Sequence, residues 1–167
     1  MIVGIDPGLT GAVGVLDEDG QIVRVEDTPS FLLEGKRRDY DVPGMVRLLV
    51  QNGATGHIRH VFIERWQARP EASPQSMGKI GYGAGLWIGI LSAFHMPHTV
   101  VWPQTWQRTM YQGAVGEGKE RSLLIASRLW PNYKFETSRH DRADSLLIAE
   151  YGRRTLLGLE KRWEEIG

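Results

Sequence analysis

The sequence contains no cysteine among its 167 residues. This absence excludes disulfide frameworks, thiol nucleophiles, and zinc or iron–sulfur sites built on thiolate ligands. No apolar run is long enough to span a bilayer, because the longest strongly apolar stretch covers only Gly85 to Phe94. The N-terminal apolar run has no basic lead-in and no cleavage-site pattern, so we expect no secretory signal. These absences predict a soluble, cytoplasmic protein.

The chain also lacks an excess of either charge, since 20 Lys and Arg residues stand against 20 Asp and Glu residues. Zero net charge disfavours a uniformly basic nucleic-acid coat. The charges are nevertheless segregated: residues 1–35 hold seven acids and only Arg24, whereas residues 36–134 hold thirteen basic and six acidic residues. A basic middle segment can present a face to phosphates. From charge alone, a solvated surface of mixed sign is the simpler interpretation.

Hydrophobic residues make up 41% of the chain and charged residues 24%, which is typical of a globular protein. We expect one domain over residues 1–167, with no repeats. Strand and helix patterns alternate along the chain, and residues 27–39 look irregular. The expected strands are 2–5, 12–16, 21–25, 60–63 and 98–101, and the expected helices are 41–52, 75–94, a short one from Pro103, 117–130 and 139–157. This order predicts an α/β fold, a mixed five-stranded sheet flanked by helices.

Three glycines, Gly81, Gly85 and Gly89, recur every four residues and so share one helix face. Each glycine costs the helix roughly 1 kcal/mol relative to alanine. We therefore expect a close approach at this face, from the sheet, from DNA or from a second copy of the chain. Trp87 and Leu91 on the same helix could lie at an interface or in the core, and the core is the commoner location of large apolar residues.

Four carboxylates occupy positions where acids are unusual. Asp6 and Glu64 each end an apolar strand, and Asp141 and Asp144 lie three apart on one face of a helix. Acids gathered beside a core need a cation, and hard oxygen ligands suit Mg²⁺, with Mn²⁺ expected to substitute. Two ions at such a site would serve phosphodiester hydrolysis.

Each acid taken singly also has a simpler explanation. Asp6 could cap a turn, and Glu64 could pair with Arg65 or Arg69 at the surface. Asp141 and Asp144 could favour the dipole of a helix N-terminus. The metal-site hypothesis depends on all four meeting at one edge of the sheet.

Three segments that hold these acids resemble the signature segments of RuvC-type Holliday junction resolvases, namely Ile2–Gly8, Val61–Glu64 and His140–Ala149. The connecting segments, with Ser76–Gly78, Pro103, Trp106 and Trp130–Pro131, are similar to those of phage-type members. The resemblance covers roughly residues 1–152 and keeps the family's order and spacing.

The resemblance implies a ribonuclease-H-like fold and a homodimer in a prokaryotic cell or a phage-infected host. It implies a metal-dependent endonuclease, with two ions per site, that resolves four-way DNA junctions by paired symmetric nicks leaving 5′-phosphate and 3′-hydroxyl ends. The family's four catalytic acids correspond to Asp6, Glu64, Asp141 and Asp144. Lys119 is the candidate basic residue near the scissile phosphate, and an ordinary solvated lysine is nearly as good an interpretation.

The candidate DNA contacts are Trp66, Arg69, Lys79 and Lys119. Trp66 lies near the position where the family places a wedging aromatic, although the correspondence is inexact, and the alternative is that it packs under its own loop. His140 stands beside Asp141, either as a partner of the acids or, slightly preferred, as a simple helix-start residue.

Other functions fit parts of the sequence. The segment Gly4–Gly11 also fits the phosphate-binding turn of actin-like ATPases, although such proteins need two lobes. A non-catalytic junction binder would need no metal, and a nuclease for flaps or forks would share all the chemistry.

Overall fold

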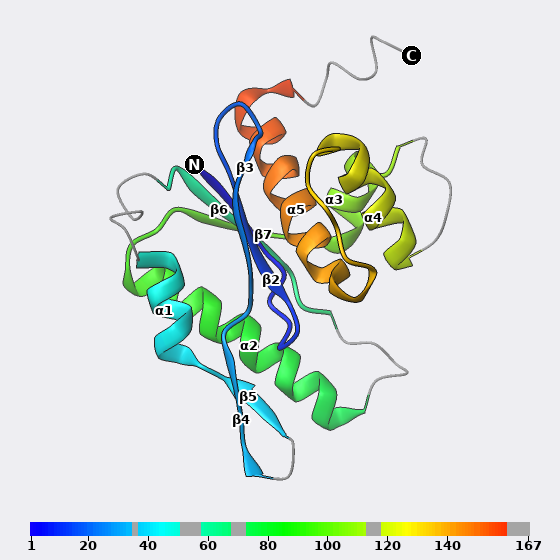
Figure 1. Ribbon diagram of the computed structural model, residues 1–167. Helices are drawn as coiled ribbons and strands as arrows, with labels where there is room; N and C mark the ends of the chain where they lie inside the picture. The colour runs from blue at the N-terminus through cyan, green and yellow to red at the C-terminus, as the bar shows by residue number, and fades with distance from the viewer. Residues whose placement is uncertain (35–36, 51–57, 68–72, 113–117, 160–167) are drawn as a thin grey trace.

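The computed structural model of the chain describes residues 1–34, 37–50, 58–67, 73–112 and 118–159. Five strands form one sheet in the order β3-β2-β1-β6-β7 (Figure 1). β1 pairs antiparallel with β2 and parallel with β6, and β2–β3 is antiparallel while β6–β7 is parallel. The strands are β1 (Ile2–Ile5), β2 (Ala12–Leu16), β3 (Ile22–Asp27), β6 (His60–Glu64) and β7 (His98–Val101). The expected mixed five-stranded sheet is confirmed.

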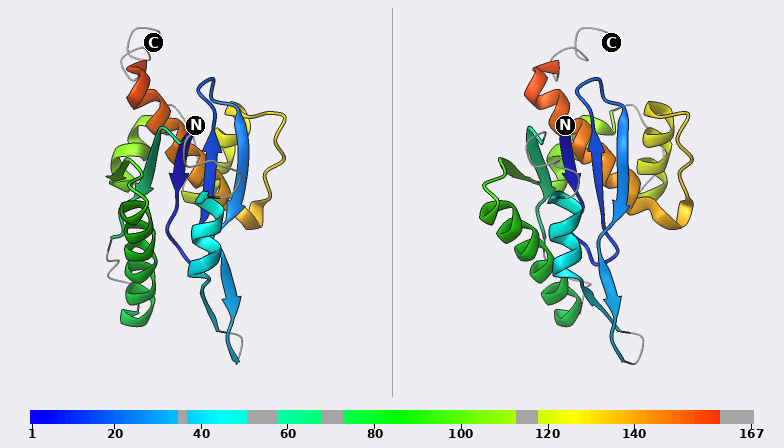
Figure 2. Two further views of the ribbon diagram at one scale, coloured as in Figure 1. Left: turned by 90° about the vertical axis from the view of Figure 1, so that its left-hand side faces the viewer. Right: turned by 60° about the vertical axis from the view of Figure 1, so that its left-hand side comes forward.

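Helices cover both faces of this sheet, so the molecule has three layers (Figure 2). One face packs against α1 (Val42–Val50) and α2 (Pro74–Ala93). The other face packs against α5 (His140–Leu157), with α3 (Pro103–Met110) and α4 (Gly118–Leu129) beside α5. A short 3₁₀ turn, Thr137–Arg139, leads into α5. We call these the α2 face and the α5 face.

Alternation along the central strands decides which side chains enter which core. Val3 and Ile5 of β1, and Val61 and Ile63 of β6, are buried on the α2 face. Ile2 and Phe62 are buried on the α5 face. By the same alternation, the acids that end these strands point to the α5 face.

The helix boundaries follow local signals in the sequence. The Asp41 side chain accepts a hydrogen bond from the Gly44 amide at the start of α1, and Ser73 caps α2 by accepting from the Ser76 amide. Gly158 ends α5 with a left-handed φ of 67°, a conformation that favours glycine. These ends agree with the expected helices to within one or two residues.

Residues 27–39, expected to be irregular, contain a second, two-stranded sheet. β4 (Ser30–Leu32) pairs with β5 (Arg38–Tyr40), and the hairpin extends beyond the main sheet (Figure 1). Its strands are only three residues long, too short for an alternating pattern to be recognised. Tyr40 anchors the hairpin. Its hydroxyl oxygen lies 3.3 Å from the carbonyl oxygens of Pro7 and Lys79, and its one hydrogen is shared between these two acceptors.

The glycines that permit close packing are not the three that the sequence indicated. Among the described residues, no atom lies within 4 Å of a Cβ built at Gly85 or Gly89, and one at Gly81 meets only the Trp66 ring at 3.8 Å. Packing of this stripe against the sheet was therefore a wrong expectation, because Gly83, Ala84 and Trp87 face inward instead. Trp87 and Leu91 are fully buried, as expected.

Close packing occurs instead where α5 crosses β1 and β2. Gly4 and Gly14 are directly paired across these strands. A Cβ at Gly4 would overlap the Ser145 carbonyl oxygen, and one at Gly14 would lie 2.9 Å from the Leu146 amide nitrogen. The two glycines make a flat patch that lets the α5 backbone rest on the sheet.

None of the helices in the described part of the chain combines the length and the apolar character that crossing a membrane requires.

Gly4→Ala should lower the free energy of unfolding by about 1–3 kcal/mol, because the added methyl group has no room against α5. The matched control is Gly78→Ala in α2, where the Cβ would meet open space and helix propensity should add up to about 1 kcal/mol. Urea unfolding of the two variants measures both. Equal stability of the two variants would contradict the close contact.

Candidate active site

Asp6 stands at the end of β1, at the entrance to a tight turn. Its amide donates to the Ala12 carbonyl oxygen at 3.0 Å, which closes the turn, and its Oδ1 accepts from the Gly8 amide at 3.2 Å. Gly11 donates in turn to the Gly8 carbonyl oxygen at 2.9 Å. The turn therefore holds the Asp6 carboxylate in one orientation, on the α5 face.

Glu64 ends the neighbouring strand β6, which runs parallel to β1 with Ile5 opposite Ile63. The two acids therefore emerge side by side at the carboxyl ends of adjacent strands. The Nε1–H of Trp106 in α3 donates to Oε2 of Glu64 at 2.8 Å, and the Trp106 side chain is only 1% exposed. A buried indole with this one donor fixes the rotation of the carboxylate.

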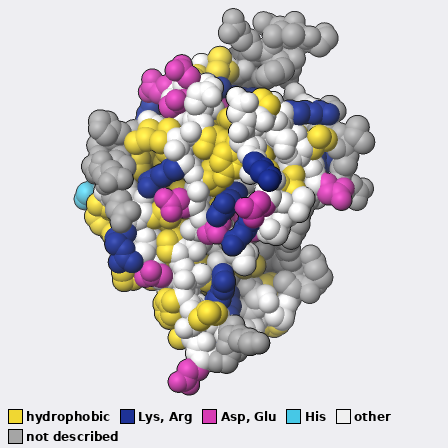
Figure 3. Space-filling view, viewed as in Figure 1, with side chains coloured by type: hydrophobic (Ala, Val, Ile, Leu, Met, Phe, Trp, Pro, Cys, Tyr) yellow, Lys and Arg dark blue, Asp and Glu magenta, His cyan; other side chains and the backbone are white. Residues whose placement is uncertain are grey.

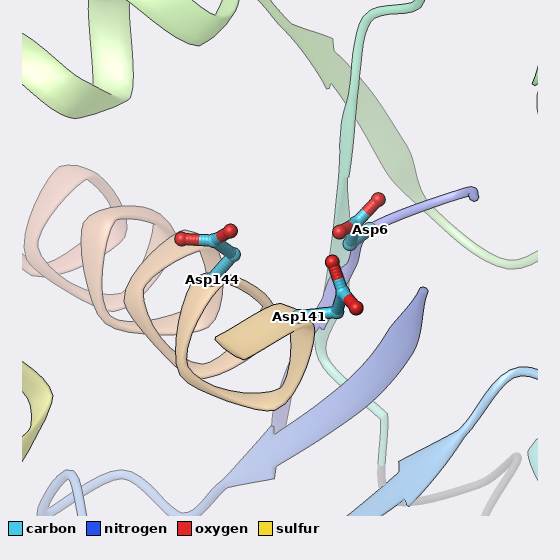
Figure 4. Close-up of side chains that lie close together, drawn as sticks. All are labelled: Asp6, Asp141 and Asp144. Atoms are coloured by element: carbon cyan, nitrogen blue, oxygen red, sulfur yellow. The ribbon is translucent and has the colours of Figure 1, made fainter. Parts of the chain in front are cut away.

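Asp141 and Asp144 come from the first turns of α5, which the Gly4–Gly14 patch holds against the sheet. Asp6, Asp141 and Asp144 each offer one carboxylate oxygen, and these three oxygens lie within 4.8 Å of one another (Figure 4). Asp6 faces the two helix acids across this gap. We call these three side chains the acid cluster.

Asp6 experiences electrostatic repulsion from the other three acids of the site. Burial raises the pKa of Asp6 well above its usual value, and the nearby charges of Glu64, Asp144 and Asp141 raise this pKa further, while the Gly8 amide lowers it. A divalent cation would reverse this balance, because it favours ionised carboxylates. Oxygen ligands alone, close together and partly shielded from water, fit Mg²⁺ or Mn²⁺.

The start of α5 is tied to the edge strand by ion pairs. Asp27 at the end of β3 accepts from Arg139 at 2.6 Å and from Arg142 at 2.7 Å. These two arginines flank Asp141 in the sequence. The hydrogen bond from Arg142 lowers the pKa of Asp27, with the charges of Arg142, Arg139 and Arg38 adding to the effect and partial burial opposing it. Asp27 therefore holds the helix turn that presents Asp141.

The structure thus brings together three of the four predicted acids, and it places Glu64 beside them on the next strand. His140 Nε2 lies 3.0 Å from Oδ1 of Asp141, which favours the partner role over that of a simple helix-start residue. Trp66 is 37% exposed, and its ring lies near Gly81 of α2. Its own loop includes residues outside the described part of the chain, so packing under that loop stays untested.

The structure says less about the three basic residues that the sequence suggests as DNA contacts. Lys79 lies in α2, and Lys119 is at the second position of α4, where only its backbone is described. Arg69 lies outside the described residues. Their roles as DNA contacts stay predictions.

Trp106, Asp27 and Tyr40 are residues of this site that sequence reasoning missed as functional. From the sequence, Trp106 has a place in a connecting segment but no role, and nothing in its sequence context indicates that its indole reaches a strand 42 residues earlier. Asp27 looked like one of several acids in an acidic segment. Each of the three contributes through a tertiary hydrogen bond: Trp106 with Glu64, Asp27 with Arg139 and Arg142, and Tyr40 with the Pro7 carbonyl oxygen.

Comparison with solved structures identifies the fold. The chain matches Thermus thermophilus RuvC in complex with a Holliday junction substrate, with a TM-score of 0.64, 17% identity, and coverage of 93% of this chain and 94% of that one. It also matches a second Thermus thermophilus RuvC structure, with a TM-score of 0.56, 18% identity, and coverage of 95% and 97%. The chain has a RuvC-like fold. No family model and no curated protein sequence matches it.

The RuvC-like fold accounts for the convergence of the acids. The parallel β1–β6 pair places Asp6 and Glu64 at one edge, and the final helix crosses the sheet at that edge. The expected ribonuclease-H-like sheet is confirmed, while the likeness to phage-type members stays a prediction.

Trp106→Phe should weaken Mn²⁺ binding about 10–100-fold, because Glu64 loses the donor that orients its carboxylate. Calorimetric titration with Mn²⁺ measures the change. Trp130→Phe is the matched control, because it removes an equally short indole hydrogen bond, 2.8 Å to the Gly20 carbonyl oxygen, far from the acids. Equal Mn²⁺ affinity in both variants would contradict the positioning role.

Asp27→Asn should lower Tm at neutral pH, because the folded state loses ion pairs with two arginines. The folded-state pKa of Asp27 is lowered, so its stabilisation is present above the unfolded pKa of about 3.9 and is lost as the pH falls through the folded value. Thermal unfolding of both proteins from pH 7 to pH 3 should show the Tm difference shrinking below about pH 4. A difference that stays constant to pH 3 would contradict an ionic origin.

Proposed function

We propose that this protein is a metal-dependent endonuclease that resolves four-way DNA junctions. The observation that carries the proposal is the acid cluster, with Glu64 beside it, at the sheet edge of a RuvC-like fold. One solved structure with this fold is RuvC in complex with a Holliday junction substrate. Hydrolysis of a phosphodiester adds water across the P–O3′ bond and leaves a 5′-phosphate and a 3′-hydroxyl.

In this proposal Asp6, Glu64, Asp141 and Asp144 hold two Mg²⁺ ions. When bound, such ions supply a water of lowered pKa and charge stabilisation for the leaving oxygen. The chain's own residues do the positioning: the turn after β1 orients Asp6, and Trp106 orients Glu64. The Asp27 ion pairs hold the helix turn of Asp141. Lys119 is the proposed partner of the scissile phosphate.

Paired symmetric nicks require two active sites related by a two-fold axis, so we propose a homodimer. The open glycine stripe of α2 supports this, because Gly85 and Gly89 line an apolar groove with Tyr82 and Phe94. Tyr82 is 56% exposed and Phe94 44% exposed, so two large side chains border this groove, and contiguous apolar patches are typical of interaction sites. Trp66 lies near the N-terminal half of the same helix, where it could stack on bases of a splayed junction.

The structure disfavours the ATPase alternative at the turn itself. In phosphate-binding turns, backbone amides point at the anion. Here the Gly8 amide donates to Asp6 and the Gly11 amide donates to the Gly8 carbonyl oxygen, so both are used inside the turn.

Asp6→Asn should reduce cleavage of a synthetic four-way junction in Mg²⁺ by at least about a hundredfold, because the cluster loses a charged ligand. Junction binding should stay within about twofold, since no basic residue changes. Tm should not fall, because repulsion among the acids is relieved. Asp19→Asn, in the exposed β2–β3 turn, is the control for loss of one carboxylate.

The cleavage assay compares four-way, flap, fork and linear duplex DNA, each with and without Mg²⁺. Preference for the four-way junction supports resolution, and equal cutting of flaps and forks identifies a broader branched-DNA nuclease. Wild-type cleavage by Asp6→Asn would refute the metal site, and junction binding without metal-dependent cutting would identify a non-catalytic binder.

A further inference from the structure

A hollow of about 480 Å³ lies beside the acid cluster, between the turn after β1, the β4–β5 hairpin and the start of α5. Its polar lining comes from Thr10, Thr28, Ser30, Arg38 and Arg139, together with Asp27. The volume is within the range of about 300–1,000 Å³ that is typical of ligand sites. None of the roles described above uses this hollow.

The hollow carries a surplus of positive charge. Asp27 is the only acid that lines it among the described residues, and Arg139 and Arg142 both bind Asp27. Arg38 is exposed and has no carboxylate within 4.0 Å among the described residues. Two guanidinium groups, those of Arg38 and Arg139, therefore line the hollow against one carboxylate, and Arg142 binds that same carboxylate without lining the hollow. Figure 3 shows Lys and Arg side chains interleaved with Asp and Glu side chains in the middle of this face, above the hairpin.

Thr28 gives an independent indication that a ligand binds here. It is 4% exposed, it lines the hollow, and its Oγ1, which is closed off from solvent, has no hydrogen-bond partner among the described residues. A buried hydroxyl without a partner is costly in a folded protein. After rotation of the Thr28 side chain, an anion in the hollow could accept a hydrogen bond from this hydroxyl, together with hydrogen bonds from Thr10, Ser30 and Arg38.

A backbone hydrogen bond connects the wall of the hollow to the turn that holds Asp6. The Thr28 amide donates to the Gly11 carbonyl oxygen at 2.8 Å, and Gly11 closes the turn that holds Asp6. Arg139, on the opposite wall, is two residues before Asp141. The turn that holds Asp6 and the segment that leads into Asp141 therefore both contribute residues to the wall of this hollow.

We propose that the hollow binds a backbone phosphate of the cleaved DNA strand, close to the scissile phosphate, and so fixes the register of the cut. This inference rests on the proposed junction-cleaving function. Arg38 and Arg139 supply the charge, and Thr28 supplies a buried donor. Such a contact is independent of base identity, because every nucleotide carries the same phosphate.

Arg38→Gln and Arg37→Gln form a matched pair, because each removes one positive charge from the same hairpin and only Arg38 lines the hollow. Binding to a four-way junction is measured in EDTA, where no cutting occurs, using junctions with single neutral methylphosphonates placed at successive positions around the cut site. For the wild type, one position should weaken binding about tenfold. Arg38→Gln should bind the unmodified junction about tenfold more weakly than the wild type. A methylphosphonate at the sensitive position should not weaken its binding further. Arg37→Gln should keep the wild-type affinity and the wild-type sensitivity to that methylphosphonate.

Thr28→Val separates ligand binding from a structural role. Because the hydroxyl has no partner among the residues that the structure describes, the variant should keep or raise Tm, yet it should bind the junction several-fold more weakly. A lower Tm with unchanged binding would overturn the proposal. So would identical methylphosphonate patterns for Arg38→Gln and the wild type in a protein that cuts junctions normally. A wild type that neither binds nor cuts branched DNA would instead refute the proposed function, and this inference with it.

Discussion

Repulsion among carboxylates is the constraint on which the site depends. Asp6, Asp141 and Asp144 place oxygens within 4.8 Å of one another, and Glu64 adds its charge from the next strand. Without a cation this arrangement opposes its own formation, because each charge raises the pKa of Asp6. The surrounding structure must therefore hold the acids in place, and it does so at several independent points.

These points are ordinary packing and hydrogen-bond contacts. The paired glycines Gly4 and Gly14 let α5 lie on the sheet, which brings its first turns to Asp6. Trp106 fixes Glu64 from α3, and Asp27 holds the start of α5 through two arginines. Tyr40 ties the β4–β5 hairpin to the turn after β1 through the Pro7 carbonyl oxygen. A site supported from this many elements is rigid before any ligand arrives, which is the condition for positioning a phosphate.

The sequence predicted the elements whose signals are local and periodic. The five strands of the main sheet and the helices follow from apolar periodicity, and the hypothesis that Asp6 meets Asp141 and Asp144 followed from a strand-end acid and two acids on one helix face. The β4–β5 hairpin did not, because three-residue strands have no pattern to read. Spacing identified the glycine stripe as one helix face without saying what that face contacts, and the structure excludes only its packing against the sheet. Trp106 and Asp27 were missed because their partners lie 42 and more than 110 residues away in sequence.

Anomalous diffraction from crystals grown with Mn²⁺ tests the metal site most directly, because it locates the ions without relying on catalysis. We expect peaks between Asp6 and the two helix acids, with Glu64 as a further ligand. Asp144→Asn crystals should lose or weaken these peaks. A catalytically active protein whose crystals bind Mn²⁺ elsewhere, and not at these four acids, would contradict the assignment.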